Sequence, residues 1–205
     1  HLCVYLGHCI QVVKHNLYDH AGYYLSFAVF DANNRQILYT VASRGHHADI
    51  GGKTPGSAPP DSQQIHQEGV LIDNFLLVSQ GKMRDSETRA VLASGKYPCR
   101  NIDQNMADLS AQVAANATGV LELQKITSKF GRETVHAYMT HVQNNAEESV
   151  RQVLDVLHDC DFTYPLDSGD QIKVVITVDH KARQGTIDFT GTSPQNKFNY
   201  NAPLA

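Results

Sequence analysis

Two long stretches of helical periodicity, separated by a single glycine, dominate the second half of the sequence. The first contains Met106, Leu109, Val113, Val120, Leu123, Ile126 and Phe130, and the second contains Val135, Tyr138, Val142, Ala146, Val150, Val153 and Leu157. Steps of three, four and seven residues place these side chains on one face of a helix. Gly131 stands between them, and glycine readily adopts the left-handed conformation that ends a helix. The pattern predicts two helices in an antiparallel hairpin.

Patterns typical of β-strands lie on both sides of the helical stretches. Runs rich in aliphatic and aromatic residues predict strands over residues 23–30, 36–42, 69–72, 75–78, 172–178 and 185–191. A short helix is expected over residues 86–92, with Ser86 as its N-cap, whereas residues 1–22 favour a helix only weakly. This order predicts an α+β fold, in which mixed or antiparallel β segments flank a long helical hairpin.

A long irregular segment over residues 43–67 follows the second predicted strand. It is rich in glycine, proline and histidine and contains almost no large aliphatic residue, so we expect neither a buried strand nor a stable helix there. Irregular segments of this length inside a domain are usually functional. We therefore expect the chemistry of the protein in this segment.

The candidate catalytic residues of this segment are His46, His47 and Asp49. Imidazole nitrogen and carboxylate oxygen suit a borderline divalent cation, and His47 and Asp49 are two residues apart. If the preceding strand continues through them, they face the same side and could share one metal ion. His46 would then face the other way, as a supporting partner of the site or a general base. The alternative is that these three side chains are ordinary solvated surface residues without a catalytic role.

Neighbouring residues are candidates for binding the substrate. Arg44 could hold a carboxylate in bidentate fashion, although a surface ion pair is an equally ordinary role. Gly51 and Gly52 allow the backbone to bend tightly and to approach a ligand closely. His66 and Glu68 are weaker candidates for a further metal ligand.

Composition and charge exclude several classes of function. The 17 basic and 21 acidic residues give a net charge of −4, which provides no electrostatic reason to expect nucleic acid or a membrane as partner. No apolar run approaches the length of a membrane span, and the sequence has no nucleotide-binding motif. The four cysteines fit neither a metal knuckle nor a disulfide framework. We expect reduced thiols and a cytoplasmic location.

Three separated motifs resemble the hydantoinase B/5-oxoprolinase family. The sequence SRGHHADIGGKTPGSAPP at residues 43–60, followed by Gln-Glu-Gly at 67–69, is similar to the family's signature region. Residues 105–119 resemble the family's Asp-Leu-Ala-Gln-Ala-Asn helix, and residues 187–194 together with 199–203 resemble its second signature. The resemblance covers about residues 36–205, and residues 1–35 are divergent or shortened. We therefore expect one partial domain of this family over residues 1–205.

This resemblance implies ATP-dependent opening of a cyclic amide, either 5-oxoproline to glutamate or a hydantoin ring. It also implies that ATP is bound by a separate hydantoinase A-type domain or subunit, in agreement with the missing nucleotide motif. A metal-bound water, or one activated by a histidine, would attack the ring carbon. The identity of the divalent metal ion is left open. We expect an oligomer, and we expect the isolated chain to associate through unpaired strand edges.

Two alternatives remain at this point. The family's Asn-His-Pro and His-Leu-Pro-Asp motifs have no match between His1 and Asp31, which favours a truncated, non-catalytic paralogue that keeps the scaffold or a subunit-association role. An acetone carboxylase-type subunit shares the same motifs. Both ends of the sequence look cut, so we expect a fragment of a larger protein, inactive if the missing segment completes the site.

Overall fold

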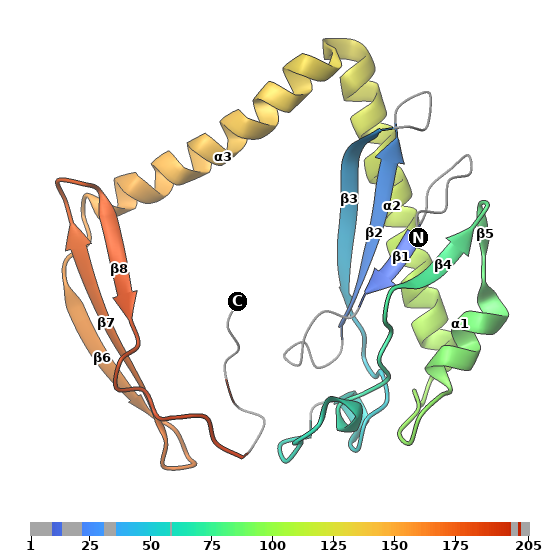
Figure 1. Ribbon diagram of the computed structural model, residues 1–205, viewed down its shortest axis with the longest axis horizontal. Helices are drawn as coiled ribbons and strands as arrows, with labels where there is room; N and C mark the ends of the chain where they lie inside the picture. The colour runs from blue at the N-terminus through green and yellow to red at the C-terminus, as the bar shows by residue number, and fades with distance from the viewer. Residues whose placement is uncertain (1–9, 14–21, 31–35, 58, 198–200, 202–205) are drawn as a thin grey trace. The chain divides into compact units, whose positions relative to one another are not determined.

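Eight strands and three α-helices form the described part of the chain, residues 10–13, 22–30, 36–57, 59–197 and 201 of a computed structural model (Figure 1). The chain divides into two compact units. One consists of residues 1–125 and 196–205, and the other of residues 126–195. Each unit has its own antiparallel sheet. Together the elements confirm the α+β class.

The first unit contains a five-stranded sheet in the order β3-β2-β1-β4-β5. Its strands are β1 (Ile10–Val13), β2 (Gly22–Phe30), β3 (Ile37–His46), β4 (Phe75–Ser79) and β5 (Lys82–Met83). The alternating pattern of β2 puts Tyr23, Leu25, Phe27 and Val29 in the core. The antiparallel pairing of β2 and β3 confirms the first predicted hairpin. Its turn lies outside the described residues.

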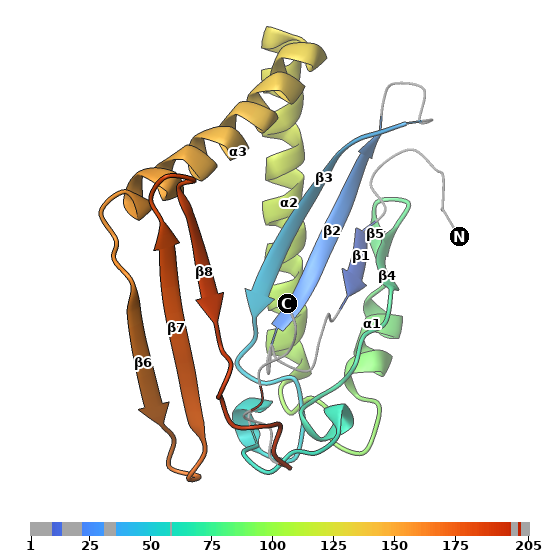
Figure 2. The same ribbon diagram turned by 60° about the vertical axis from the view of Figure 1, so that its left-hand side comes forward.

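Helix α2 (Ile102–Phe130) packs across β2 and β3 with one face of the part that belongs to the first unit. Figure 1 shows it behind β2, and in Figure 2 the lower part of β3 crosses in front of it. Met106, Leu109 and Val120 on this face are buried. Gly119 allows a close approach, because a Cβ there would lie 2.9 Å from Val41 Cγ1. The predicted helix is therefore confirmed, and it is the element against which the site is built.

Several local predictions for the first unit are wrong. Residues 10–13 form strand β1 rather than part of a helix, and the rest of residues 1–22 lies outside the described part except Gly22, which begins β2. Residues 69–72 form no strand; Val70 and Ile72 are nevertheless buried, so their apolar character reflects core packing. Helix α1 (Asp85–Leu92) begins one residue before Ser86, and its N-cap position is occupied by Arg84.

The second unit contains helix α3 (Arg132–Leu154) and a three-stranded sheet in the order β6-β7-β8. Its strands are β6 (Cys160–Pro165), β7 (Gln171–Asp179) and β8 (Gln184–Asp188). The pairing of β7 with β8 confirms the second predicted hairpin, although β8 is shorter than expected and β6 was not predicted. Gly131 has a φ of 82°, as expected for the residue that ends α2. Because the two helices lie largely in different units, their antiparallel packing stays a prediction.

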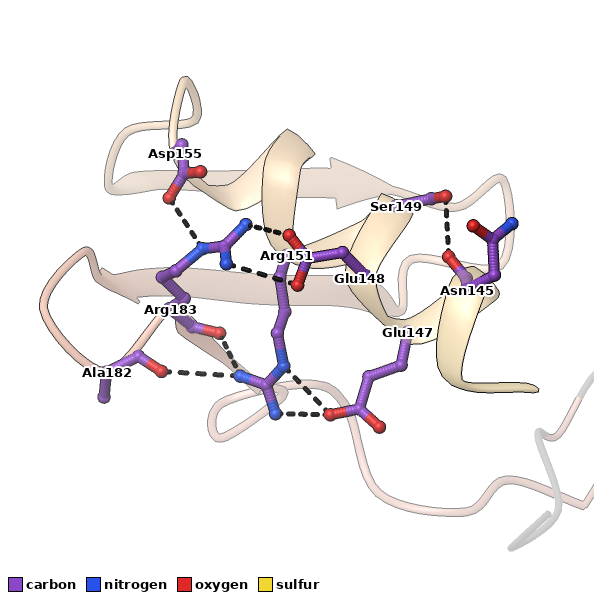
Figure 3. A network of polar contacts seen from close by, with 8 residues as sticks. All are labelled: Asn145, Glu147, Glu148, Ser149, Arg151, Asp155, Ala182 and Arg183. Carbon is purple, nitrogen blue, oxygen red and sulfur yellow. Dashed lines mark hydrogen bonds and ion pairs between the residues drawn. The ribbon is translucent and has the colours of Figure 1, made fainter. Parts of the chain in front are cut away.

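An arginine cluster ties the turn between β7 and β8 to the last turns of α3 (Figure 3). Arg183 binds Glu148 in bidentate fashion and also reaches Asp155. Arg151 binds Glu147 and donates to the carbonyl oxygen of Arg183 at 2.7 Å. These groups are largely exposed, so each pair contributes little on its own and the cluster acts mainly by fixing geometry.

Within the part of the chain that the structure describes, none of the helices combines the length and the apolar run that crossing a bilayer requires. Cys99, which is buried, and Cys160, which is exposed, are thiols that form no disulfide. Cys3 and Cys9 lie outside the described residues.

Candidate functional site

The end of strand β3 presents Arg44 and His46 on one face of the sheet. The strand continues to His46, four residues beyond its predicted end, because its register with β2 extends to the pair of Gly22 with His46. Every second residue from Thr40 to His46 is exposed. A guanidinium and an imidazole therefore lie two residues apart on the same solvent-facing side.

His47, the next residue, lies on the opposite side and is fully buried. Its Nε2 is 3.4 Å from Oε1 of Gln112, and its Nδ1 is 3.3 Å from Nδ2 of Asn105. The carboxylate oxygen Oδ2 of Asp108 is 3.4 Å from Nδ1, and the ring of Tyr23 makes an edge contact with a centroid distance of 4.9 Å. His47 therefore packs between the sheet and helix α2.

Burial lowers the pKa of His47 below its ordinary value of 6.5, while Asp108 and the hydrogen bond with Gln112 oppose this shift. A lowered folded-state pKa means that the proton binds the unfolded chain more tightly. The contribution of His47 to the free energy of unfolding is therefore fully present above about pH 6.5, and it is lost as the pH falls toward the folded-state pKa. The imidazole is neutral in the folded protein at neutral pH.

We expect the free energy of unfolding to decrease between pH 7.5 and pH 5.0 through protonation of His47. Urea unfolding followed by circular dichroism measures this change, and the variant His47→Gln should show a smaller one. The exposed His66 provides the matched control, because His66→Gln should keep the full pH dependence. An equal pH dependence in all three proteins would contradict the assignment.

Asp49 is held by hydrogen bonds on both carboxylate oxygens. Oδ1 accepts from the backbone N–H groups of Gly51 and Arg100, and Oδ2 accepts from the N–H of Gly56 and the Arg100 guanidinium, the last at 2.7 Å. Burial raises the pKa of Asp49, but these hydrogen bonds outweigh it and keep the pKa below its usual range. Asp49 therefore organises the turn that follows His47.

Gly51 and Gly52 have φ values of 88° and 92° and lie against backbone. A Cβ on Gly51 would lie 2.3 Å from the carbonyl oxygen of Tyr97, and one on Gly52 would lie 2.8 Å from that of Glu68. Ser57 fastens the same turn, since its hydroxyl accepts from Ile50 N and donates to Gly51 O. The two glycines therefore allow close packing of loop on loop.

His47 and Asp49 each have protein partners of their own in this arrangement. Both oxygens of Asp49 already accept hydrogen bonds, and both ring nitrogens of His47 have polar neighbours. Among the described residues, no group of three or more His, Cys, Asp or Glu side chains is placed to hold a metal. The metal assignment to these residues stays a prediction, and we derive no step through a metal ion.

Sequence reasoning missed four residues that build the site, namely Asn105, Asp108, Gln112 and Arg100. The first three lie within the helix motif at residues 105–119, where their spacing along one face of a predicted helix was the available signal. Arg100 had no such signal, because its link to Asp49 spans 51 positions of sequence.

The fold is therefore of the α+β class, and its candidate site is a histidine-bearing loop fixed against a long helix. The chain belongs to the family described as Hydantoinase B/oxoprolinase, whose sequence model matches residues 23–205.

Relatives in several organisms support this membership. The chain is 37% identical over 182 residues to a 5-oxoprolinase of Dictyostelium discoideum and 37% identical over 201 residues to 5-oxoprolinase 1 of Arabidopsis thaliana, with 83% and 86% of the chain covered. These matches span only 14% and 16% of the relatives' lengths. A protein of Pseudomonas named as the B-type component of a D-/L-hydantoinase is 28% identical over 199 residues, which cover 90% of the chain and 33% of that protein.

The fold also matches a solved structure, an ATP-dependent caprolactamase from Pseudomonas jessenii. The TM-score is 0.72 at 20% sequence identity, over 95% of this chain and 34% of the caprolactamase chain. At this identity the match establishes a shared fold.

Proposed function

We propose that this chain is part of an ATP-dependent cyclic amide hydrolase that opens 5-oxoproline to glutamate. The observation that carries the proposal is the exposed pair of Arg44 and His46 on one face at the end of β3. The names of the relatives support 5-oxoproline as the substrate, because relatives named 5-oxoprolinase are 36–37% identical to the chain, against 28% for the hydantoinase component. The proposed compartment is the cytoplasm.

In this proposal Arg44 selects the substrate through its carboxylate. A guanidinium binds a carboxylate with two parallel charge-assisted hydrogen bonds. The 5-oxoproline ring has a carboxylate beside its amide nitrogen, whereas an unsubstituted hydantoin ring has none. Arg44 therefore distinguishes the two substrate classes by charge.

His46 serves as the general base in the same proposal. The ATP-binding hydantoinase A-type component transfers a phosphoryl group to the amide oxygen, which makes the ring carbon electrophilic. His46 then accepts a proton from the water that attacks this carbon. The bond between the ring carbon and nitrogen then breaks, the nitrogen takes a proton, and the carbon is left as an acyl phosphate. A second water hydrolyses the acyl phosphate to the carboxylate and inorganic phosphate. His47 and Asp49 contribute by fixing the loop beside His46.

We expect Arg44→Met to raise the KM for 5-oxoproline about tenfold or more while leaving any turnover of unsubstituted hydantoin unchanged. The assay uses the complete protein with its ATP-binding component and measures ATP-dependent formation of the ring-opened product from each substrate. Arg132→Met, an exposed arginine of the second unit, is the matched control.

Three outcomes would count against this function. An equal loss of turnover on both substrates in Arg44→Met would show that Arg44 does not select the substrate by its carboxylate. Turnover of hydantoin alone would reassign the substrate. No ATP-dependent turnover of either ring by the complete protein would favour the non-catalytic paralogue.

A further inference from the structure

Three amide side chains on one face of α2 bind backbone carbonyl groups of the elements that carry the site. Asn105 donates to the carbonyl oxygen of Asp49 at 2.8 Å, Gln112 to that of Tyr23 at 3.0 Å and Asn116 to that of Leu25 at 3.1 Å. All three amides are buried. Buried donors of this kind are costly to disturb, so the row fixes the position of α2 along β2 and the loop.

The backbone anchor of Gln112 determines which of its atoms faces His47. Since Nε2 of Gln112 donates to Tyr23 O, its Oε1 is the atom near the ring, 3.4 Å from Nε2 of His47. An amide oxygen only accepts hydrogen bonds, so the proton of the neutral ring belongs on Nε2. Gly45 leaves room for this arrangement, because a Cβ there would lie 2.7 Å from Cδ of Gln112.

Asn105 requires the same protonation state from the other side of the ring. Its Nδ2 donates to Asp49 O and is also 3.3 Å from Nδ1 of His47. An amide NH₂ group has two hydrogens and no acceptor, so Nδ1 faces it as an unprotonated acceptor. Two independently anchored amides therefore select one tautomer.

We propose that Gln112 and Asn105 are positioning residues that hold His47 as a neutral imidazole with its proton on Nε2, and that this ring fixes the loop behind His46. The inference goes beyond the proposed function, since it concerns how the loop is held and is measured without turnover. The charged or titratable groups facing the ring are Asp108, the neighbouring His46 and the buried Tyr23. Oδ2 of Asp108 lies 3.4 Å from Nδ1 and would accept a proton bound there, so Asp108 favours the other tautomer, and the proposal assigns the choice to the two anchored amides.

The test is nitrogen-15 NMR of the histidine rings in the full chain, with the His47 signals identified from their loss in His47→Gln. We expect the pattern of a single tautomer with a protonated Nε2 and an unprotonated Nδ1 at neutral pH. In Gln112→Met this pattern should give way to a mixture of tautomers. In Gln112→Glu the tautomer should persist, because the new carboxylate, like the amide oxygen that it replaces, only accepts hydrogen bonds.

The matched control is Gln124→Met, which changes an exposed glutamine of the same helix and should leave the His47 signals as in the unchanged protein. A protonated Nδ1 or a tautomer mixture in the unchanged protein would overturn the proposal. So would an unchanged tautomer in Gln112→Met. If Gln112→Met does not fold, the tautomer of His47 in the unchanged protein decides, because it is read directly from the nitrogen-15 shifts without any substitution.

Discussion

Replacing Gly51 with alanine is expected to lower the free energy of unfolding by about 4 kcal/mol. Part of the loss comes from the left-handed conformation of Gly51, with φ at 88°, which an L-residue adopts at a cost. The larger part comes from the new Cβ, which would lie 2.3 Å from the carbonyl oxygen of Tyr97 and 2.8 Å from the carbonyl carbon of Pro98. Both obstacles are backbone atoms, so the loop itself has to move.

The matched control for this prediction is Gly56→Ala in the same loop. Gly56 has a φ of 77°, but a Cβ there meets nothing within 4 Å. Its replacement has only the conformational cost, about 1 kcal/mol. Urea unfolding followed by circular dichroism measures both variants. Equal losses would show that close packing against residues 97–98 does not hold this loop.

Replacing Asp49 with alanine is expected to lower the free energy of unfolding by about 3 kcal/mol. The side chain is 15% exposed and receives hydrogen bonds from three backbone N–H groups and the Arg100 guanidinium. Its removal leaves these donors without their acceptor and separates the turn from Arg100. Thermal and urea unfolding of the same sample measure the effect.

Asp61→Ala is the control for the loss of a carboxylate. Asp61 is exposed and pairs with Lys53 at 2.6 Å, and an exposed pair of this kind contributes little to stability. We expect almost no change. A similar loss in Asp49→Ala and Asp61→Ala would mean that net charge, rather than the hydrogen bonds of Asp49, explains the result.

The long elements could be predicted from the sequence because their patterns repeat many times. Helices α2 and α3 each carry an apolar stripe over more than five turns, which outweighs local exceptions. Strand β6 was missed although Cys160, Phe162 and Tyr164 alternate with polar residues, because Asp161 and Pro165 are also typical of turns. Short apolar runs such as residues 69–72 remain ambiguous between strands and buried loops.

The site could be located from the sequence, but its roles could not be assigned. The motif at residues 43–52 identifies the loop, yet two adjacent histidines look alike until the strand's exposed face is known. The structure distinguishes an exposed His46 from a buried His47 because β3 continues to His46. The partners that decide the role of His47 come from α2, with Gln112 65 positions away in sequence.

The proposed function assigns the reaction to the exposed His46 rather than to the buried His47. The most direct test is ATP-dependent turnover of 5-oxoproline by the complete protein carrying His46→Gln, with His141→Gln, a change of an exposed histidine in α3, as control. Loss of a general base predicts a decrease in kcat of about 100-fold or more with unchanged unfolding. Turnover within a few-fold of the unchanged protein would contradict a catalytic role for His46.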